Sequence, residues 1–435
     1  MNQAHDEAVR FTSELIRIDT SNYGPGHDGP GERAAAEFVA GKLGDAGIEV
    51  TVLESEPRRT TLVANWEPPG CDTTLAPLLV HGHTDVVPAI AADWSVHPFS
   101  GEVQGGCVWG RGAVDMKDFD AVVLAVVRDR VRTARPTRRP VRLVFTADEE
   151  AGGVLGSVWL ARNHPELVAD CAVAIGEAGG FSVTAGDRRL YLIQTAEKGL
   201  LWLKLIAEGT AGHGSMRNTD NAVTTLARAI ASLADHTWPT RLHPAQAGFL
   251  DAVGEAFGME ITSDNTEQTL ARLGSIARMV GATMSHTINP TMLDAGYKAN
   301  VIPGHASAVL DGRFLPGGRD EFIATVRDLV GERIRLEILT EQPSAEAPWG
   351  TPWTDAMTTA IRAFDPEAGV TPYILSAGTD AKGWSGLGIP CYGFTPLKLA
   401  PEFDFVAMFH GVDERVPVEA LHFSVDVFDR FLDEA

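Results

Sequence analysis

Positive charge and cysteine are both scarce in this chain of 435 residues. It has 36 Lys and Arg against 58 Asp and Glu, so its formal net charge is −22 at pH 7. A surface this acidic repels phosphate backbones and anionic lipids, which argues against nucleic acid and membranes as partners. The four cysteines, Cys71, Cys107, Cys171 and Cys391, show no CxxC spacing. They indicate neither a disulfide framework nor a structural zinc knuckle, so we expect a reducing, cytoplasmic location.

Long hydrophobic runs are also missing from the sequence. No apolar run approaches the roughly 20 residues that a transmembrane helix needs. The N-terminus carries acidic residues early and lacks the apolar segment of a secretory signal. What remains is ordinary globular composition, with 44% apolar and 22% charged residues. At roughly 100–200 residues per domain, the length predicts two or three domains.

Helical and strand-like segments alternate from the beginning of the chain. The pattern predicts helices at 6–18 and 31–47 and strands at 48–54 and 61–67. Three short apolar runs follow, and each ends in acids or histidines: 77–85, 141–150 and 171–180. This alternation predicts an α/β domain with a parallel or mixed sheet, whose functional residues lie at the strand ends.

A different organisation begins near residue 189. The order strand–helix–strand–strand–helix–strand over 199–341 predicts a ferredoxin-like α+β domain, with a helical insertion near 240–280. The α/β pattern returns after residue 345. We therefore expect one α/β domain, formed by residues 1–188 and 345–435, that is interrupted by a smaller domain over 189–344.

The strand ends concentrate residues that bind metals. His83 and Asp85 lie two residues apart in HGHTDVVP, so on an extended strand their side chains share a face. Glu149 and Glu150 end the second apolar run, and Glu177 ends the third. Each motif taken alone is equally compatible with packing or with a solvated acidic turn. Together they predict a mixed nitrogen and oxygen ligand set along one sheet edge, which suits zinc, cobalt or manganese better than calcium.

Asp115 lies in WGRGAVDMKDF, directly before a strongly helical stretch. Its side chain could cap that helix. Alternatively, Gly110 and Gly112 let the backbone bring this carboxylate close to a metal. Several carboxylates at one place suit two metal ions about 3.5–4 Å apart that share a bridging acid.

The ordered set of motifs resembles the co-catalytic di-zinc peptidase and deacylase family. That family includes carboxypeptidase G, aminoacylase, carboxypeptidase S, acetylornithine deacetylase and succinyl-diaminopimelate desuccinylase. The matching runs, between residues 81 and 410, are HGHTDVVP, GRGAVDMK, DEEAGG, GE, AGHGS, NVIPG and GTDAKG. The resemblance implies a mixed-sheet zinc-hydrolase domain interrupted by a lid domain, and a homodimer formed through that lid.

The resemblance also implies a role for each site residue. The implied ligands of two Zn²⁺ ions, for which Co²⁺ or Mn²⁺ can substitute, are His83, Asp115, Glu150, Glu177 and His410. Asp115 is implied to bridge the two ions and to precede a cis peptide bond to Met116. Asp85 is implied to orient His83, and Glu149 to act as general base on a water shared by the ions.

The remaining implied residues lie in the lid and near the end of the chain. His213 resembles the lid histidine that stabilises the oxyanion, often across a dimer interface. Asn300, Arg313 and Gly378 resemble residues that bind the substrate's carboxylate, for which an arginine fork is well shaped. Without the resemblance, His213 fits a surface turn, Arg313 a solvated strand position, and His410 is one of 13 histidines with no distinguishing context.

The substrate is less well defined by the sequence. EGTAGHGSM and GTDAKG are closer to the aminoacylase and carboxypeptidase S pattern than to the GGTSDGR-like run of desuccinylases. We therefore expect an amide hydrolase that releases an amino acid from an N-acyl amino acid or short peptide with a free carboxylate. The alternatives are a dipeptidase or carboxypeptidase, an acetylornithine- or succinyl-diaminopimelate-type deacylase, a single-metal hydrolase of cyclic amides or ureido compounds, and a non-catalytic metal-binding member.

Overall fold

The three apolar runs of the sequence form neighbouring central strands of one large sheet. They are β3 (Leu78–His83), β6 (Val141–Thr146) and β7 (Val173–Gly176), and all of their residues are buried. β3 pairs in parallel with both β6 and β7, so the carboxyl ends of these strands lie at one edge. The computed structural model describes residues 3–262, 265–274 and 276–435.

The large sheet has ten strands within the described residues, and it is mixed. Its order is β1-β2-β6-β3-β7-β18-β9-β16, with β8 and β17 each paired to β9. Its other strands are β1 (Val50–Glu56), β2 (Arg59–Trp66), β8 (Ser182–Ala185), β9 (Arg188–Glu197), β16 (Ala345–Glu346), β17 (Gly369–Leu375) and β18 (Cys391–Gly393). A small sheet lies beside it, with β4 (Glu102–Gln104), β5 (Cys107–Trp109) and β19 (Arg415–Pro417).

Helices cover the large sheet and complete the α/β domain. Phe11, Phe119 and Phe428 come from three of these helices and are buried in one core, so segments from both ends of the chain pack together. The helices are α1 (Gln3–Ile16), α2 (Arg33–Asp45), α3 (Lys117–Thr133), α4 (Ser157–Asn163), α10 (Pro352–Phe364), α11 (Ala381–Ser385) and α12 (Val418–Glu434). None of the helices in the described residues combines the length and the apolar character that a bilayer crossing needs.

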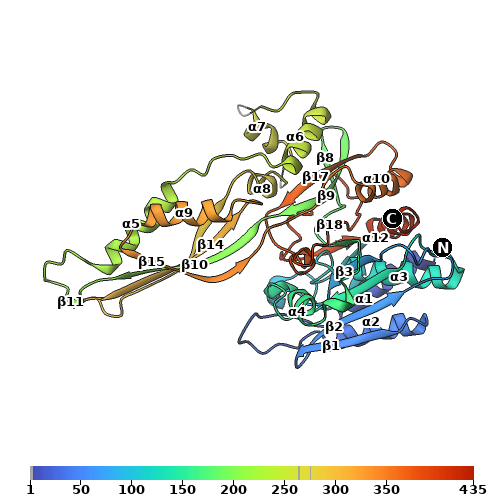
Figure 1. Cartoon of the computed structure of the whole chain (residues 1–435), viewed down its shortest axis with the longest axis horizontal. Coiled ribbons are helices and arrows are strands. Elements are labelled where there is room, and N and C mark those ends of the chain that lie inside the picture. The colour runs from blue at the N-terminus through green and yellow to red at the C-terminus, as the bar shows by residue number, and fades with distance from the viewer. Residues whose placement is uncertain (1–2, 263–264, 275) are drawn as a thin grey trace.

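The second domain is an elongated arm that extends away from the large sheet (Figure 1). Its four antiparallel strands have the order β12-β14-β10-β15, which confirms the predicted ferredoxin-like lid. Leu201, Leu203 and Leu205 alternate along β10 and pack under α5 and α9. The elements are β10 (Gly199–Glu208), α5 (Ala222–Asp235), β12 (Thr287–Ala295), β14 (His305–Phe314), α9 (Arg319–Val330) and β15 (Ile334–Gln342), with β11 (Gly212–His213) paired to β13 (Val301–Ile302) at the far tip.

Two features of the domain organisation were not evident in the sequence. The first lid strand begins at Gly199, where it was expected, but β9 belongs to the large sheet although most of it falls within the range 189–344 expected for the lid domain. The helical insertion is α6 (Pro244–Phe257), α7 (Thr266–Ala271) and α8 (Ile276–Gly281). It lies in sequence between the lid elements α5 and β12 but packs on the α/β domain, because α6 buries Phe249 and Val253 in that core. Residues 1–2 of the expected α/β domain, and residues 263–264 and 275 of the insertion, lie outside the described residues.

Candidate active site

Three strand ends at one edge of the large sheet carry three of the five candidate metal ligands and the candidate base. His83 is the last residue of β3 and is aligned with Thr146 at the end of β6. Glu149 and Glu150 follow in a short 3-10 turn, and Glu177 comes directly after β7. The parallel strands therefore bring residues that are far apart in the sequence to one place, as the strand-end pattern predicts.

Asp115 lies between two histidines. Its Oδ1 is 3.0 Å from Nε2 of His83, and its Oδ2 is 3.3 Å from Nε2 of His410. On the outer sides, His83 Nε2 is 3.3 Å from Oε2 of Glu177, and His410 Nε2 is 3.1 Å from Oε2 of Glu150. Asp115 thus directs one oxygen toward the pair His83 and Glu177 and the other toward the pair His410 and Glu150. Two cations that share a bridging carboxylate require this arrangement.

Negative charge is concentrated where these groups meet. Burial opposes protonation of His83, but Glu177 and Asp115 outweigh burial and hold the pKa of His83 well above its usual range. Hydrogen bonds to Asp115 and Glu150 raise the pKa of His410 to about 10. Burial raises the pKa of the Glu177 carboxyl to about 7. Buried carboxylates that perturb their neighbours in this way need cations, so the residues fit a metal site.

The donor atoms also lie close enough together to share ions. Those of each of two groups lie within 4.8 Å of one another: His83, Glu149 and Glu177, and His83, Asp115 and Glu150. His410 extends the second group through its contacts with Asp115 and Glu150. The peptide bond between Asp115 and Met116 is cis, which confirms that prediction.

Asp85 connects the metal-site residues behind the cluster. It is fully buried, and its Oδ1 lies 3.6 Å from Nδ1 of His83. The same carboxylate accepts hydrogen bonds from the backbone N–H groups of Glu149, at Oδ1, and of Glu150, at Oδ2, both at 3.1 Å. Asp85 therefore faces one imidazole and anchors the backbone of two acids at once.

Three residues beside the candidate ligands have left-handed backbones. Asp148, Ala178 and His410 have φ angles of 65°, 65° and 56°. Each such non-glycine conformation costs on the order of 1–3 kcal/mol, and conformations of this kind cluster at functional sites. No feature of the sequence indicated them.

A cavity of about 410 Å³ opens onto the cluster. Its polar wall consists of Asp115, Glu149, Glu150, Glu177 and His410. Burial and the Glu177 carboxylate hold the pKa of Glu149 well above its usual range. The apolar lining includes Phe181, Met279, Tyr373, Leu375, Val406 and Phe409. Met279 comes from α8, so the helical insertion forms part of this cavity.

The model of the peptidase family M20/M25/M40 matches residues 79–434 of the chain. The protein belongs to this family. Aminoacylase-1 of Sus scrofa is 28% identical to it over 433 residues, which cover 98% of this chain and 94% of that protein. The probable carboxypeptidase S-like 2 of Dictyostelium discoideum is 27% identical over 385 residues, covering 85% of this chain and 73% of that protein.

The fold is also shared with solved structures. The M20 family metallo-carboxypeptidase Sso-CP2 from Sulfolobus solfataricus superposes with a TM-score of 0.74 at 17% identity, over 99% of both chains. The chain is therefore a metallohydrolase of the M20 peptidase and aminoacylase type. Its His, Asp and Glu groups are candidate ligands for the dinuclear metal site of the M20 family.

The four remaining predicted residues do not all reach the cluster. Gly378 lines the cavity. Arg313 lies on the lid sheet, where both its Nε and a terminal nitrogen bond the Asp311 carboxylate at 2.7 and 3.0 Å. His213 and Asn300 are exposed at the lid tip, far from the large sheet (Figure 1). The structure thus brings Gly378 to the cluster but leaves His213 and Asn300 away from it in the same chain.

Few features of the sequence indicated the apolar wall of the cavity. Two residues of this wall, Val406 and Phe409, stand in FDFVAMFH directly before His410, and this apolar run beside a candidate ligand could have indicated them. Met279 had no such signal, because only the packing of the insertion on the large sheet brings it to the cavity.

Proposed function

We propose that this M20 family member is a di-zinc amide hydrolase that releases an amino acid from an N-acyl amino acid or short peptide. The observation that carries the proposal is the position of Asp115 between His83 and His410, beside Glu149 in an open cavity. The substrate carries a free carboxylate. The match to aminoacylase-1 over nearly the full length of both chains supports this class.

In the proposed mechanism, His83 and Glu177 would hold one zinc ion, Glu150 and His410 would hold the other, and Asp115 would serve as the ligand that both share. Zinc, when bound, supplies Lewis acidity toward the amide carbonyl and the attacking water. Co²⁺ or Mn²⁺ has the same ligand preferences and can substitute.

Glu149 is the proposed general base. Its carboxylate takes a proton from the attacking water and then gives a proton to the leaving amine, so one group serves both steps. Asp85 keeps His83 oriented through its backbone carbonyl, which lies 3.0 Å from Nδ1 of His83, and its carboxylate holds the backbone of Glu149 at the same time. The apolar lining of the cavity, in particular Phe181 and Phe409, supports an apolar acyl group or side chain in the substrate.

We further propose a homodimer formed through the lid, in which His213 acts at the partner's site. The exposed apolar side chains of Met292, Leu293 and Tyr297 lie on and beside β12, the edge strand of the lid sheet. An open edge with apolar side chains favours pairing with a second copy. His213 would then stabilise the oxyanion, and Asn300, Arg313 and Gly378 would bind the substrate carboxylate. The unpaired cysteines in the described residues support a cytoplasmic location.

The test is amine release from a panel of substrates with the zinc-loaded protein. The panel holds N-acetyl and long-chain N-acyl amino acids, dipeptides, acetylornithine and succinyl-diaminopimelate, with Glu149→Gln as the inactive control. Cleavage confined to N-acyl amino acids is the expected result. Preference for dipeptides would make the protein a peptidase with the same machinery. No cleavage of any member with two zinc ions bound would contradict the proposal and favour a non-catalytic role.

A further inference from the structure

Behind the metal cluster, the loop that carries Glu149 and Glu150 is held by buried polar groups from the start of the chain. We define this loop, residues 147–156, as the base loop. Asp148 is its buried second residue; its Oδ2 accepts a hydrogen bond from the N–H of Leu155 at 2.9 Å. Its backbone carbonyl accepts from Gly153 at 2.7 Å. Asp148 therefore ties both ends of the base loop together.

Asn22 links Asp148 to Asp85. Its amide nitrogen donates to Oδ2 of Asp85 at 2.9 Å and to Oδ1 of Asp148 at 3.2 Å. Its amide oxygen accepts from a terminal nitrogen of Arg59 and from the N–H of Gly24, both at 3.0 Å. The opposite orientation of the amide would place its oxygen against two carboxylates, so the charges around Asn22 fix which way it points.

The backbone around Asn22 is also fixed, by contacts with Val86. Its N–H donates to the carbonyl of Val86 at 2.8 Å, and Ser21 forms a parallel bridge with Val86. Val86 directly follows Asp85, so the segment around Asn22 is attached to the same loop whose carboxylate it binds. Asn22 is buried, as are Asp85 and Asp148.

Arg59 supplies the positive charge of this network. It lies at the start of β2, ion-pairs with the fully buried Glu32, and has a terminal nitrogen 3.9 Å from Oδ1 of Asp148. Three buried carboxylates, those of Glu32, Asp85 and Asp148, thus converge on one guanidinium and one amide. Buried carboxylates are costly unless they are paired and hydrogen-bonded, so this arrangement holds its members in defined positions.

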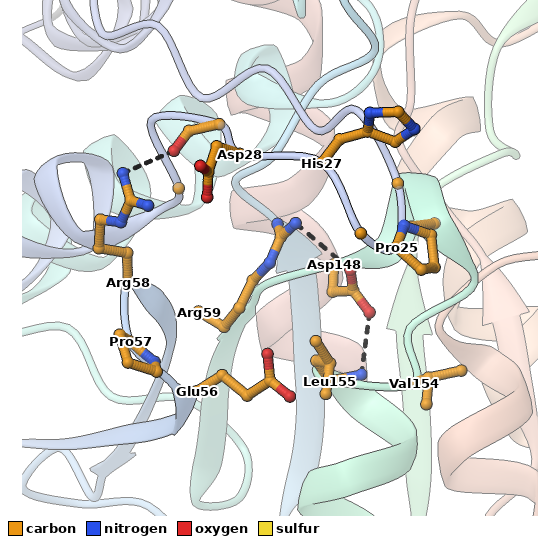
Figure 2. A pocket seen from close by; sticks show the side chains of 15 residues that line it. Pro25, His27, Asp28, Glu56, Pro57, Arg58, Arg59, Asp148, Val154 and Leu155 are labelled. Atoms are coloured by element: carbon orange, nitrogen blue, oxygen red, sulfur yellow. Dashed lines mark hydrogen bonds and ion pairs between the residues drawn. The ribbon is translucent and has the colours of Figure 1, made fainter.

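The network borders a cavity that is separate from the metal cluster. This cavity has a volume of about 440 Å³ and is lined by the loop 24–31, Arg59, Asp148 and Leu155. Figure 2 shows Arg59 and Asp148 pointing toward each other in its wall, with Asp148 also bonded to Leu155. The guanidinium of Arg59 is therefore accessible to small molecules from a side that the substrate does not use.

We propose that Asn22 and Arg59 are positioning residues for the base loop. Through Asp85 and Asp148 they hold the backbone from which Glu149 and Glu150 project, and Asp85 also faces His83. They act on the site only through these carboxylates. The inference rests on the proposed function, in which Glu149 is the general base.

The test compares Arg59→Ala and Asn22→Ala with Arg33→Ala as a matched control. Arg33 follows Glu32 in the chain and ion-pairs with Glu54 at 2.5 Å, with half of its side chain exposed. We expect kcat to fall about 10- to 100-fold in both network variants while KM changes little, because outer partners of metal sites have effects of this size. Arg33→Ala should match the wild type.

Guanidinium rescue separates positioning from a general structural role. Millimolar guanidinium chloride should restore part of the lost kcat in Arg59→Ala, because the ion can enter the cavity and occupy the vacated place. The same addition should not help Asn22→Ala, and sodium chloride should not help either. Folded Arg59→Ala with wild-type kcat, or with a loss that guanidinium leaves untouched, would overturn the proposal.

One further variant and one further measurement test the proposal where the alanine variants alone would not decide it. Arg59→Lys keeps a charge near Glu32 but loses the fork that also bonds Asn22, so its kcat should still fall; wild-type kcat in this variant would overturn the proposal if Arg59→Ala does not fold. Zinc affinity, measured by competition with a chelator without substrate, should weaken about 10-fold or more in both alanine variants. The zinc-affinity measurement tests the network even if the wild type cleaves no substrate of the panel. Such a lack of cleavage would count against the proposed function but not against the network.

Discussion

The catalytic domain and the lid differ in how exposed and how well hydrogen-bonded their candidate functional residues are. In the catalytic domain, His83 and Asp85 are buried, and each makes several hydrogen bonds with neighbouring polar groups. In the lid, His213 and Asn300 are exposed at a tip formed by two-residue strands. His213 contacts Ser215, two residues along the same turn, at 2.8 Å.

This difference shows that the catalytic domain brings its candidate ligands together, whereas the lid exposes His213 and Asn300 far from them. The cluster forms because parallel strands end at a common edge, which is a property of a single sheet. The lid tip can serve a catalytic site only if the lid moves a long way or a second subunit supplies that site. The four predictions below test this contrast between the domains.

The largest expected effect is at the general base. Glu149→Gln should lower kcat by about 10²–10⁴-fold, because the amide cannot accept the proton of the attacking water. Metal content and the unfolding midpoint should stay close to wild type. The measurement is steady-state kinetics with metal analysis, and Glu166→Gln, on an exposed glutamate of the same domain, is the control. Retained turnover in Glu149→Gln would rule out this role.

The next effect is at the lid tip. His213→Ala should lower kcat by about 10²–10³-fold, as expected for removal of an oxyanion donor, without loss of bound metal. His305→Ala, which removes another exposed lid histidine, should have wild-type kinetics. Equal loss of metal and of turnover in His213→Ala would mean that the residue is structural.

Mixing the two inactive variants tests whether the lid serves the partner's site. Dimers reassembled from equal amounts of Glu149→Gln and His213→Ala chains should recover about a quarter of wild-type activity, because half are hybrids and each hybrid has one complete site of two. The assay is turnover after reversible dissociation and remixing. If His213 acts within its own chain, no hybrid has a complete site and no activity returns.

The smallest effect concerns the cavity wall supplied by the insertion. Met279→Ala should lower kcat/KM for long-chain N-acyl substrates roughly 10-fold and leave N-acetyl substrates nearly unchanged, because only the longer chain loses apolar contact. Leu242→Ala, at an exposed leucine just before α6, is the control. Equal changes for both substrates would show that Met279 does not contact the acyl chain.

Much of the catalytic domain could be predicted because its signals are local. Short, mostly apolar runs that end in HGH, DEE and GE identified three buried strands and the residues at their ends, and parallel pairing then made those ends neighbours. The lid's strand and helix order was also visible, since each element buries one alternating or helical face. The packing of the insertion was not visible, because an apolar helix face does not identify the surface that it covers.

The amino-acid order was thus sufficient for the element types, the two-domain plan and the identity of most candidate ligands, because these depend on short-range periodicity and motif spacing. The tertiary structure alone decided three other features. It placed Asp115 between His83 and His410, it joined Asn22 and Arg59 to the base loop, and it set Met279 in the cavity wall. Each of these contacts joins residues that are far apart in the sequence, and only packing of the whole chain determines which of them meet.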